Sequence, residues 1–250
     1  MQLKKHFVEK PWGRTDIPSA FGAPEGQRIG EIWYEAANGD PLPILIKWLF
    51  TSDKLSIQVH PDDAQARTKG LASGKEECWF IWHAEPGAVL GLGTMRPLSP
   101  DEMRKASLSG EIEGLLDWKP VKAGDYFYVP AGTVHAIGAG ISLVEVQQHA
   151  DITYRLHDYG RPRELHLDDG VAVSKPAPYA DKRSGEARGN MLLVDGPHFR
   201  LWHVGDGLAK AGGTVRRWVV PLSGEGTGQC LLLEPGEPVE AAGPILVVTL

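Results

Sequence analysis

The sequence predicts an all-β protein with a small helical insertion. Of its 250 residues, 30 are Gly and 19 are Pro, and these residues form the many turns that an all-β chain needs. Between the turns lie short segments rich in aromatic and β-branched residues, which favour strands. A chain of this length forms one large β domain or two modest ones around a substantial core.

The composition argues against several classes of protein. The formal net charge is −6 and no cluster of Lys or Arg stands out, which disfavours a nucleic acid or an anionic membrane as partner. The longest apolar run, residues 42–50, is too short to span a membrane. Cys78 and Cys230 are too few for a disulfide framework or a thiolate zinc site. The N-terminal residues lack a signal-peptide core, so we expect a cytoplasmic protein.

Before residue 100 the pattern predicts four strands and one short helix. The helix is expected over 61–70, because acidic residues begin it, Lys69 lies near its end and Gly70 stops it. The strands are expected at 31–34, 43–50, 55–60 and 76–82.

The segment 55–60 alternates strictly between apolar and polar residues. The two faces are Leu55, Ile57 and Val59 on one side, and Ser56, Gln58 and His60 on the other. Polar residues on an alternate face usually contact solvent, but in a barrel they can line the lumen instead.

Two helices are expected between the β segments, as an insertion at about 99–118. Ser99 to Glu102 form a capping box with Pro at the first helical position, which predicts a helix to about Ser107. A second helix is expected over 111–117. A further strand is predicted at 141–148.

The polar, Pro-rich segment 166–189 is expected to be a linker. Residues 190–250 then form an abbreviated C-terminal β half, with strands predicted at 199–204, 217–222, 229–233 and 245–250.

The stretch 124–135 is the most informative part of the chain. Its first half is aromatic and β-branched, which predicts a strand. Pro130 cannot donate to a ladder and Gly132 can take a positive φ, so a tight turn follows. The chain then enters another strand that carries His135. A hairpin of this kind holds an imidazole at a fixed place.

A metal site is a reasonable hypothesis from these residues. Gln58 and His60 point the same way from one strand, and His135 comes from the hairpin. One carboxylate in the same lumen would complete a set suited to Zn²⁺, Mn²⁺ or Fe²⁺. Glu76 and Glu77 begin the next strand, and the alternation does not choose which of them faces inward.

The hairpin resembles a known motif. The spacing of Gly124, Pro130, Gly132 and His135 is similar to the second sequence motif of the cupin superfamily. That motif normally ends with Asn four residues after the His, where this chain has Ala139.

Over roughly its first two-thirds, the chain resembles the type I mannose-6-phosphate isomerase family in its short bacterial form. Each motif alone is weak, but four in order at family-like spacing make the resemblance specific. The motifs are Gln58–Asp63, Gly74–Trp79, Pro130–Ala136 and Thr153–Arg161.

The resemblance implies a fold. We expect a metal-binding cupin (jelly-roll) barrel in residues 1–165, and a reduced second cupin-like half in 190–250. The second half carries His198 and His203 but no Pro-x-Gly-x-x-His hairpin. We therefore predict that it covers the barrel and binds no metal.

The resemblance also implies the site residues. It selects Glu77 over Glu76, gives the catalytic place to Arg155 and puts Lys75 beside the site as a second catalytic residue. The implied cofactor is Zn²⁺ or another divalent ion such as Mn²⁺ or Co²⁺. Its implied ligands are Gln58, His60, Glu77 and His135.

The implied reaction converts mannose 6-phosphate to fructose 6-phosphate through an enediolate. It needs a Lewis acid near the sugar oxygens, a cation where negative charge develops and a base. Lys75, Glu77 and a metal-bound water all remain candidates for the base. Lys75 and Arg161 are candidates for binding the phosphate. Asp158 either orients Arg155 or a sugar hydroxyl, or pairs with Arg161.

Two alternatives stay open at this point. A cupin oxygenase also uses two His and a carboxylate, to hold non-haem iron, and a bicupin could bind sugar without turnover. The cations Lys75, Arg155 and Arg161 favour an anionic sugar substrate over oxygen chemistry. We expect a small-molecule sugar phosphate as the partner, and a monomer or homodimer.

Overall fold

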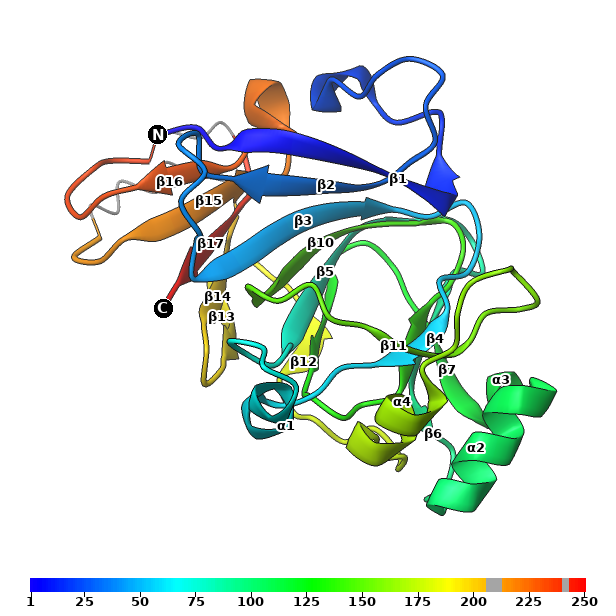
Figure 1. Ribbon diagram of the computed structural model, residues 1–250. Helices are drawn as coiled ribbons and strands as arrows, with labels where there is room; N and C mark the ends of the chain where they lie inside the picture. Colours follow the sequence, from blue (N-terminus) through cyan, green and yellow to red (C-terminus); the bar gives the residue numbers. More distant parts are fainter. Residues whose placement is uncertain (206–212, 240–242) are drawn as a thin grey trace.

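The computed structural model describes residues 1–205, 213–239 and 243–250 and consists of three antiparallel sheets (Figure 1). The largest, the central sheet, has seven strands, which are in sheet order β1 (Lys4–Arg14), β2 (Ile29–Glu35), β3 (Ile44–Phe50), β10 (Ile141–Gln148), β5 (Glu77–Ala84), β8 (Asp125–Val129) and β12 (Ser184–Glu186). The second sheet has five, which are β11 (Tyr154–His157), β4 (Ile57–Val59), β9 (His135–Ile137), β6 (Val89–Thr94) and β7 (Leu116–Pro120).

The third sheet, called the C-terminal sheet, follows in the chain. Its strands are β13 (Met191–Asp195), β14 (Arg200–Val204), β17 (Ile245–Thr249), β15 (Arg217–Pro221) and β16 (Leu231–Leu233). The all-β class expected from the turn content is therefore confirmed.

The central sheet is buried on both faces, and strand β5 shows how. Cys78 and Phe80 belong to a core shared with the C-terminal sheet, whereas Trp79 and Ile81 belong to a core shared with the second sheet. Alternate residues of a strand point to opposite faces, so each face of β5 meets a different layer. The central and second sheets form the barrel, and the C-terminal sheet packs on the outer face of the central sheet.

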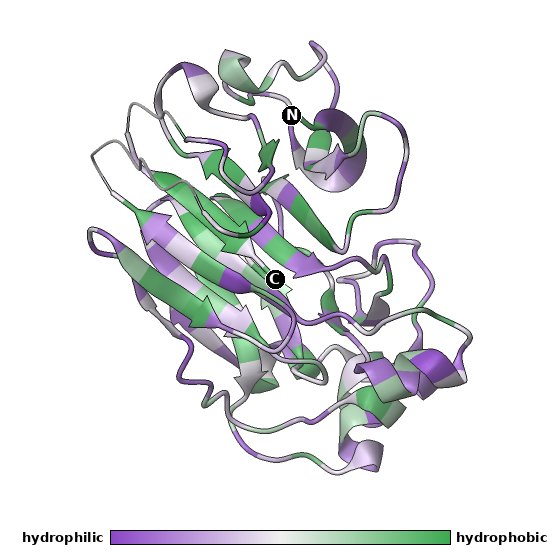
Figure 2. Ribbon diagram, turned by 90° about the vertical axis from the view of Figure 1, so that its left-hand side faces the viewer, coloured by the Kyte–Doolittle hydropathy of each residue, from purple (hydrophilic) through white to green (hydrophobic). Residues whose placement is uncertain are grey.

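Hydrophobic residues are concentrated along the strands between these layers, and hydrophilic residues lie mostly on loops and short helices (Figure 2). The helices are α1 (Asp63–Thr68), α2 (Pro100–Ser109), α3 (Ile112–Leu115) and α4 (Leu167–Val173). Single 3₁₀ turns occur at Ser19–Phe21 and Gly224–Gly226. No helix among the described residues is long and apolar enough to cross a membrane.

Helices α2, α3 and α4 cover the outer face of the second sheet. Met103 of α2 and Val173 of α4 share a core cluster with Ile57 and Val59 of β4. The apolar face predicted for 55–60 therefore packs on helices, although the strand itself spans only 57–59. Because Ile57 and Val59 face the helices, the alternate residue Gln58 faces the barrel.

The capping box predicted for the first inserted helix is present. Ser99 accepts from the backbone N–H of Glu102, whose carboxylate accepts from the N–H of Ser99. The second inserted helix was predicted too long, because residues after Leu115 form strand β7 instead. Strand β7 pairs with β6 at Gly91. A Cβ added to Gly91 would lie only 2.9 Å from the side chain of Leu116.

Several elements lack a clear sequence signal. β1 contains Pro11, and a strand at the edge of a sheet tolerates proline because one side of its backbone needs no partner. The segment 166–189, expected to be a linker, contains α4 and β12. β12 pairs with β8, so this segment belongs to the central sheet rather than to a free connection.

The shared core predicts unequal effects for two neighbours on β14. Leu201 is fully buried in the core between the central and C-terminal sheets, whereas Trp202 is 40% exposed on the other face. Leu201→Ala should lower the free energy of unfolding by about 2–5 kcal/mol because it leaves a cavity. Trp202→Ala should cost less than about 1 kcal/mol. Urea denaturation measures both, and equal losses would contradict the layered packing.

Candidate metal centre and active site

Three strands bring His60, Glu77 and His135 together. His60 directly follows β4, Glu77 begins β5 and His135 begins β9. The pairing of β4 with β9 sets Gln58 opposite His135, which fixes the relative place of both histidines. One nitrogen of each histidine and one oxygen of Glu77 all lie within 4.8 Å of one another. Three of the four ligands implied by the family resemblance therefore lie together.

The two imidazoles are oriented by backbone carbonyls. The Nδ1 of His60 lies 2.7 Å from the carbonyl oxygen of Ile152, and the Nδ1 of His135 lies 2.9 Å from that of Thr133. A carbonyl only accepts hydrogen bonds, so each Nδ1 carries the proton and each Nε2 keeps its lone pair. The Nε2 atoms lie 3.6 Å (His60) and 3.3 Å (His135) from Oε1 of Glu77. Both lone pairs are thus available at one point, an arrangement typical of metal-binding histidines.

Glu77 is a buried anion in need of cations. Its side chain has no exposure, and neither carboxylate oxygen has a hydrogen-bond partner among the described residues. The Nζ of Lys75 lies 2.7 Å from Oε2 as an ion pair. Burial opposes ionisation, but the charge of Lys75 outweighs it and holds the pKa of Glu77 well below its usual value.

The same burial keeps the histidines neutral. It lowers the pKa of His60 to about 4, helped by the charge of Lys75, and it also lowers the pKa of His135. Two neutral imidazoles and one buried carboxylate are the donor set that divalent transition metals bind. These residues therefore fit a metal ion.

The neighbouring Glu76 lies elsewhere. Its carboxylate accepts from the hydroxyl of Tyr128, and its backbone N–H donates to the side chain of Gln148. The inward position is occupied by Glu77, on the same face as Trp79 and Ile81.

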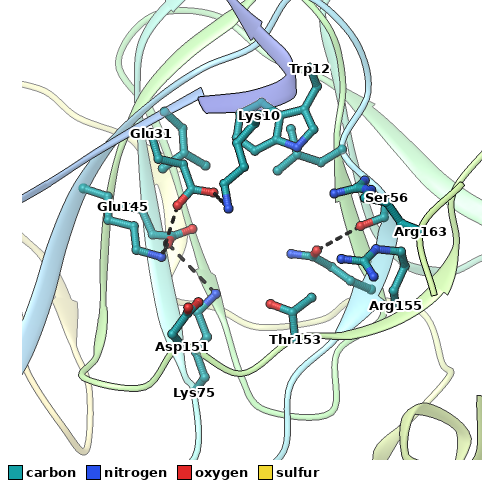
Figure 3. A pocket seen from close by; sticks show the side chains of 14 residues that line it. Lys10, Trp12, Glu31, Ser56, Lys75, Glu145, Asp151, Thr153, Arg155 and Arg163 are labelled. Carbon is teal, nitrogen blue, oxygen red and sulfur yellow. Dashed lines mark hydrogen bonds and ion pairs between the residues drawn. The ribbon is translucent and has the colours of Figure 1, made fainter. Parts of the chain in front are cut away.

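Gln58 and Lys75 connect this group to a pocket. The Nε2 of Gln58 lies 3.2 Å from that of His135, and the Nζ of Lys75 lies 3.1 Å from that of His60. Both residues also line the pocket, which encloses about 530 Å³ of space open to solvent. The other lining residues are Lys10, Trp12, Glu31, Lys47, Leu49, Leu55, Ser56, Glu145, Asp151, Thr153, Arg155 and Arg163 (Figure 3).

One side of the pocket is a series of alternating charges. In Figure 3, Glu31, Glu145 and Lys75 lie on this side. The Nζ of Lys10 lies 3.2 Å from Oε1 of Glu31. The Nζ of Lys47 lies 3.7 Å from Oε2 of Glu31 and 3.3 Å from Oε1 of Glu145. The same Oε1 of Glu145 lies 4.0 Å from the Nζ of Lys75. Each lysine on this side is thus balanced by a carboxylate.

The opposite side carries two arginines. Ser56, Arg155 and Arg163 lie there in Figure 3. Arg163 forms two hydrogen bonds of 2.6 Å with the buried carboxylate of Asp158, which fixes its guanidinium. Arg155 donates from Nη1 to the carbonyl of Glu164, and its buried Nε has no partner among the described residues. Burial, and next the charge of Arg163, lower the pKa of Arg155, as expected where cations crowd.

The structure separates the expected substrate-binding residues into two groups. Lys75 and Arg155 line the pocket, whereas Asp158 and Arg161 are not among its lining residues. Asp158 is 3% exposed and holds both Arg161 and Arg163 through ion pairs. Arg161 also donates to the carbonyl of Lys54. Of the alternatives considered for Asp158, the pairing with Arg161 is the one present.

Sequence reasoning missed most of the charged pocket wall. A usable signal existed for Lys47 and Glu145, because each is a lone charge inside an apolar strand, β3 or β10. Such charges are rarely buried without partners. Arg163 gives no comparable signal, because its position depends on how the loop after β11 folds back.

Comparisons with known proteins agree with this geometry. No family model matches the chain. It is 38% identical over 243 residues to the mannose-6-phosphate isomerase of Streptococcus mutans, which covers 80% of this chain and 77% of the relative. It is 34% identical over 220 residues to the probable mannose-6-phosphate isomerase GmuF of Bacillus subtilis, covering 72% and 69%.

Solved structures agree on the fold. The crystal structure of the mannose 6-phosphate isomerase from Bacillus subtilis superposes with a TM-score of 0.82 at 26% identity, over 100% of this chain and 99% of that one. A variant of phosphomannose isomerase from Salmonella typhimurium gives 0.76 at 13% identity, over 99% and 98%, which supports the fold alone. The expected cupin fold is confirmed, and by its sequence the chain belongs to the mannose-6-phosphate isomerase family.

Proposed function

We propose that this chain is a metal-dependent isomerase that interconverts mannose 6-phosphate and fructose 6-phosphate through an enediolate. The observation that carries the proposal is the group formed by His60, Glu77 and His135 at a pocket lined by Lys75 and Arg155. The relatives named mannose-6-phosphate isomerase favour this reaction over oxygenase chemistry. An intact donor set likewise favours turnover over sugar binding alone.

The metal ion is proposed to be Zn²⁺, with Mn²⁺ or Co²⁺ as alternatives. His60, Glu77 and His135 would hold it, and Gln58 would be the fourth ligand. In the structure the amide nitrogen of Gln58 faces His135. A 180° rotation of the amide exchanges its nitrogen and oxygen, and the oxygen then faces the proposed metal position. A bound divalent ion supplies a Lewis acid close to the sugar oxygens.

The charge of the pocket supports a phosphorylated substrate. Its lining contains five cationic residues and three carboxylates, which leaves an excess of two positive charges. This excess matches a phosphate group that carries about −1.5 to −2 at neutral pH. The three lysines of one wall pair with Glu31, Glu145 and Glu77. On the other side Arg155 forms no ion pair among the described residues, and Arg163 shares Asp158 with Arg161, so the excess positive charge lies with these arginines. We place the phosphate near Arg163.

Arg155 and Lys75 act on the reacting end of the sugar. Arg155 pairs across the sheet with Gln58, so it lies beside one of the proposed metal ligands. Its planar fork of donors suits two adjacent sugar oxygens as negative charge builds on them. Glu77 and Glu145 overcome burial and raise the pKa of Lys75, which favours Lys75 as a donor rather than as the base. A cytoplasmic location and a monomeric or homodimeric state remain predictions of the sequence.

Removing the metal should abolish activity. Chelation should inactivate the enzyme, and added Zn²⁺, Mn²⁺ or Co²⁺ should restore it. Glu77→Gln removes the buried charge and should lose the ion. The matched variant Glu76→Gln alters only a carboxylate that contacts Tyr128 and should keep one ion per chain. Metal analysis and a coupled assay on mannose 6-phosphate measure both effects. Full activity after chelation, or a strict need for iron and oxygen, would contradict the proposal.

Arg155→Ala should act mainly on kcat. By analogy with the loss of an oxyanion donor, the decrease is expected to be about 10²–10³-fold. Arg155→Lys keeps the charge but loses the fork, so it should also be severely impaired. Metal content and Tm should hardly change, and Arg104→Ala, a surface arginine paired with Asp168, serves as control. Near-normal kcat in Arg155→Ala would remove Arg155 from the mechanism.

Arg163→Ala should act mainly on KM for the phosphorylated substrate. Its guanidinium is proposed to bind the phosphate, which takes no part in the proton transfer, so binding weakens while kcat changes little. Inorganic phosphate should inhibit the wild type competitively and the variant less. An unchanged KM with an unchanged inhibition constant would place the phosphate elsewhere in the pocket.

A further inference from the structure

The backbone at Arg155 lies on an open sheet edge. β11 is the outermost strand of the second sheet, so β4 pairs with one side of it and no strand among the described residues pairs with the other. Its pairing with β4 is also irregular between Arg155 and His157. Unpaired backbone groups at such an edge need other partners to keep the strand in place.

His166 supplies those partners. Its backbone N–H donates to the carbonyl of Arg155 at 2.8 Å, and the N–H of Arg155 donates to the Nδ1 of His166 at 3.1 Å. The carbonyl of Glu164, two residues earlier, accepts from Nη1 of Arg155 at 2.7 Å. The short segment 164–166 therefore holds Arg155 at its N–H, its carbonyl and its guanidinium.

The bond to the imidazole is chemically specific. A backbone N–H can only donate, so Nδ1 of His166 must be unprotonated and act as the acceptor. Asn places its Oδ1 at the equivalent position of the side chain and also accepts. Leu has a similar branch at that position but cannot accept, so it would leave the N–H of Arg155 without its partner.

We propose that His166 is a positioning residue for the isomerase reaction, which acts by holding Arg155 in the pocket. This inference rests on the role proposed above for Arg155. It does not require His166 to contact the substrate, and His166 does not line the pocket. Loss of the acceptor removes the one of the three contacts to Arg155 that the side chain of His166 makes, which loosens the strand edge at the N–H of Arg155 and shifts its guanidinium from the place where charge develops.

The test compares His166→Leu with His166→Asn. His166→Leu should lower kcat about 10- to 100-fold, the loss expected when a buried donor is left without its partner. His166→Asn should stay within about threefold of the wild type, because the acceptor is retained. Metal content and Tm are measured for each. His203→Leu, in the C-terminal sheet, removes another half-buried histidine whose Nδ1 contacts a backbone carbonyl, and should leave kcat unchanged.

A double-mutant cycle separates this inference from the role of Arg155 itself. If His166 acts through Arg155, His166→Leu should cost little more in an Arg155→Ala background. An equal loss in both backgrounds, or a His166→Asn variant as impaired as His166→Leu, would overturn the positioning role while Arg155 keeps its own. Near-normal kcat in Arg155→Ala alone would instead overturn the proposed role of Arg155, and the inference with it.

Discussion

A carboxylate with no access to water is the constraint on which the rest of the site depends. Burying an ion costs several kcal/mol unless partners surround it, and Glu77 lies at the bottom of the barrel with no exposure. Lys75 compensates it as an ion-pair partner, but Lys75 is itself buried and needs a second anion. The compensation therefore continues across the barrel wall to the N-terminal strand, through Glu145, Lys47, Glu31 and Lys10.

Sequence patterns predicted those parts of the site that local periodicity controls. Alternation over 55–60 placed Gln58 and His60 on the inner face, and the turn at Pro130 delivered His135. The same reasoning could not choose between Glu76 and Glu77, because both faces of β5 are buried and its apolar residues do not alternate with polar ones. The family resemblance selected Glu77 correctly as the inward residue.

The proposed phosphate-binding position was harder to predict from the sequence, because it depends on a loop. Lys75 and Arg161 were the two candidates for binding the phosphate. In the loop after β11, Tyr159 takes a positive φ of 54°, and Arg163 rather than Arg161 lines the pocket. Asp158 forms ion pairs with both Arg161 and Arg163. Local spacing shows which charges can pair, whereas the direction in which a turn presents them is set by packing against distant strands. Strands β1 and β6 were not predicted, because proline or glycine within them conceals the strand pattern.

The C-terminal sheet holds no part of the pocket lined by Lys75 and Arg155, yet it shares a core with the outer face of the barrel. Trp48, Phe50 and Phe80 all lie beneath it. A chain ended early by a stop codon before residue 190 would keep every proposed ligand and still expose this apolar face to water. Contiguous surfaces of that kind promote self-association. Truncation should therefore give an aggregating fragment rather than a smaller isomerase, so residues 190–250 keep the barrel soluble without lining its pocket.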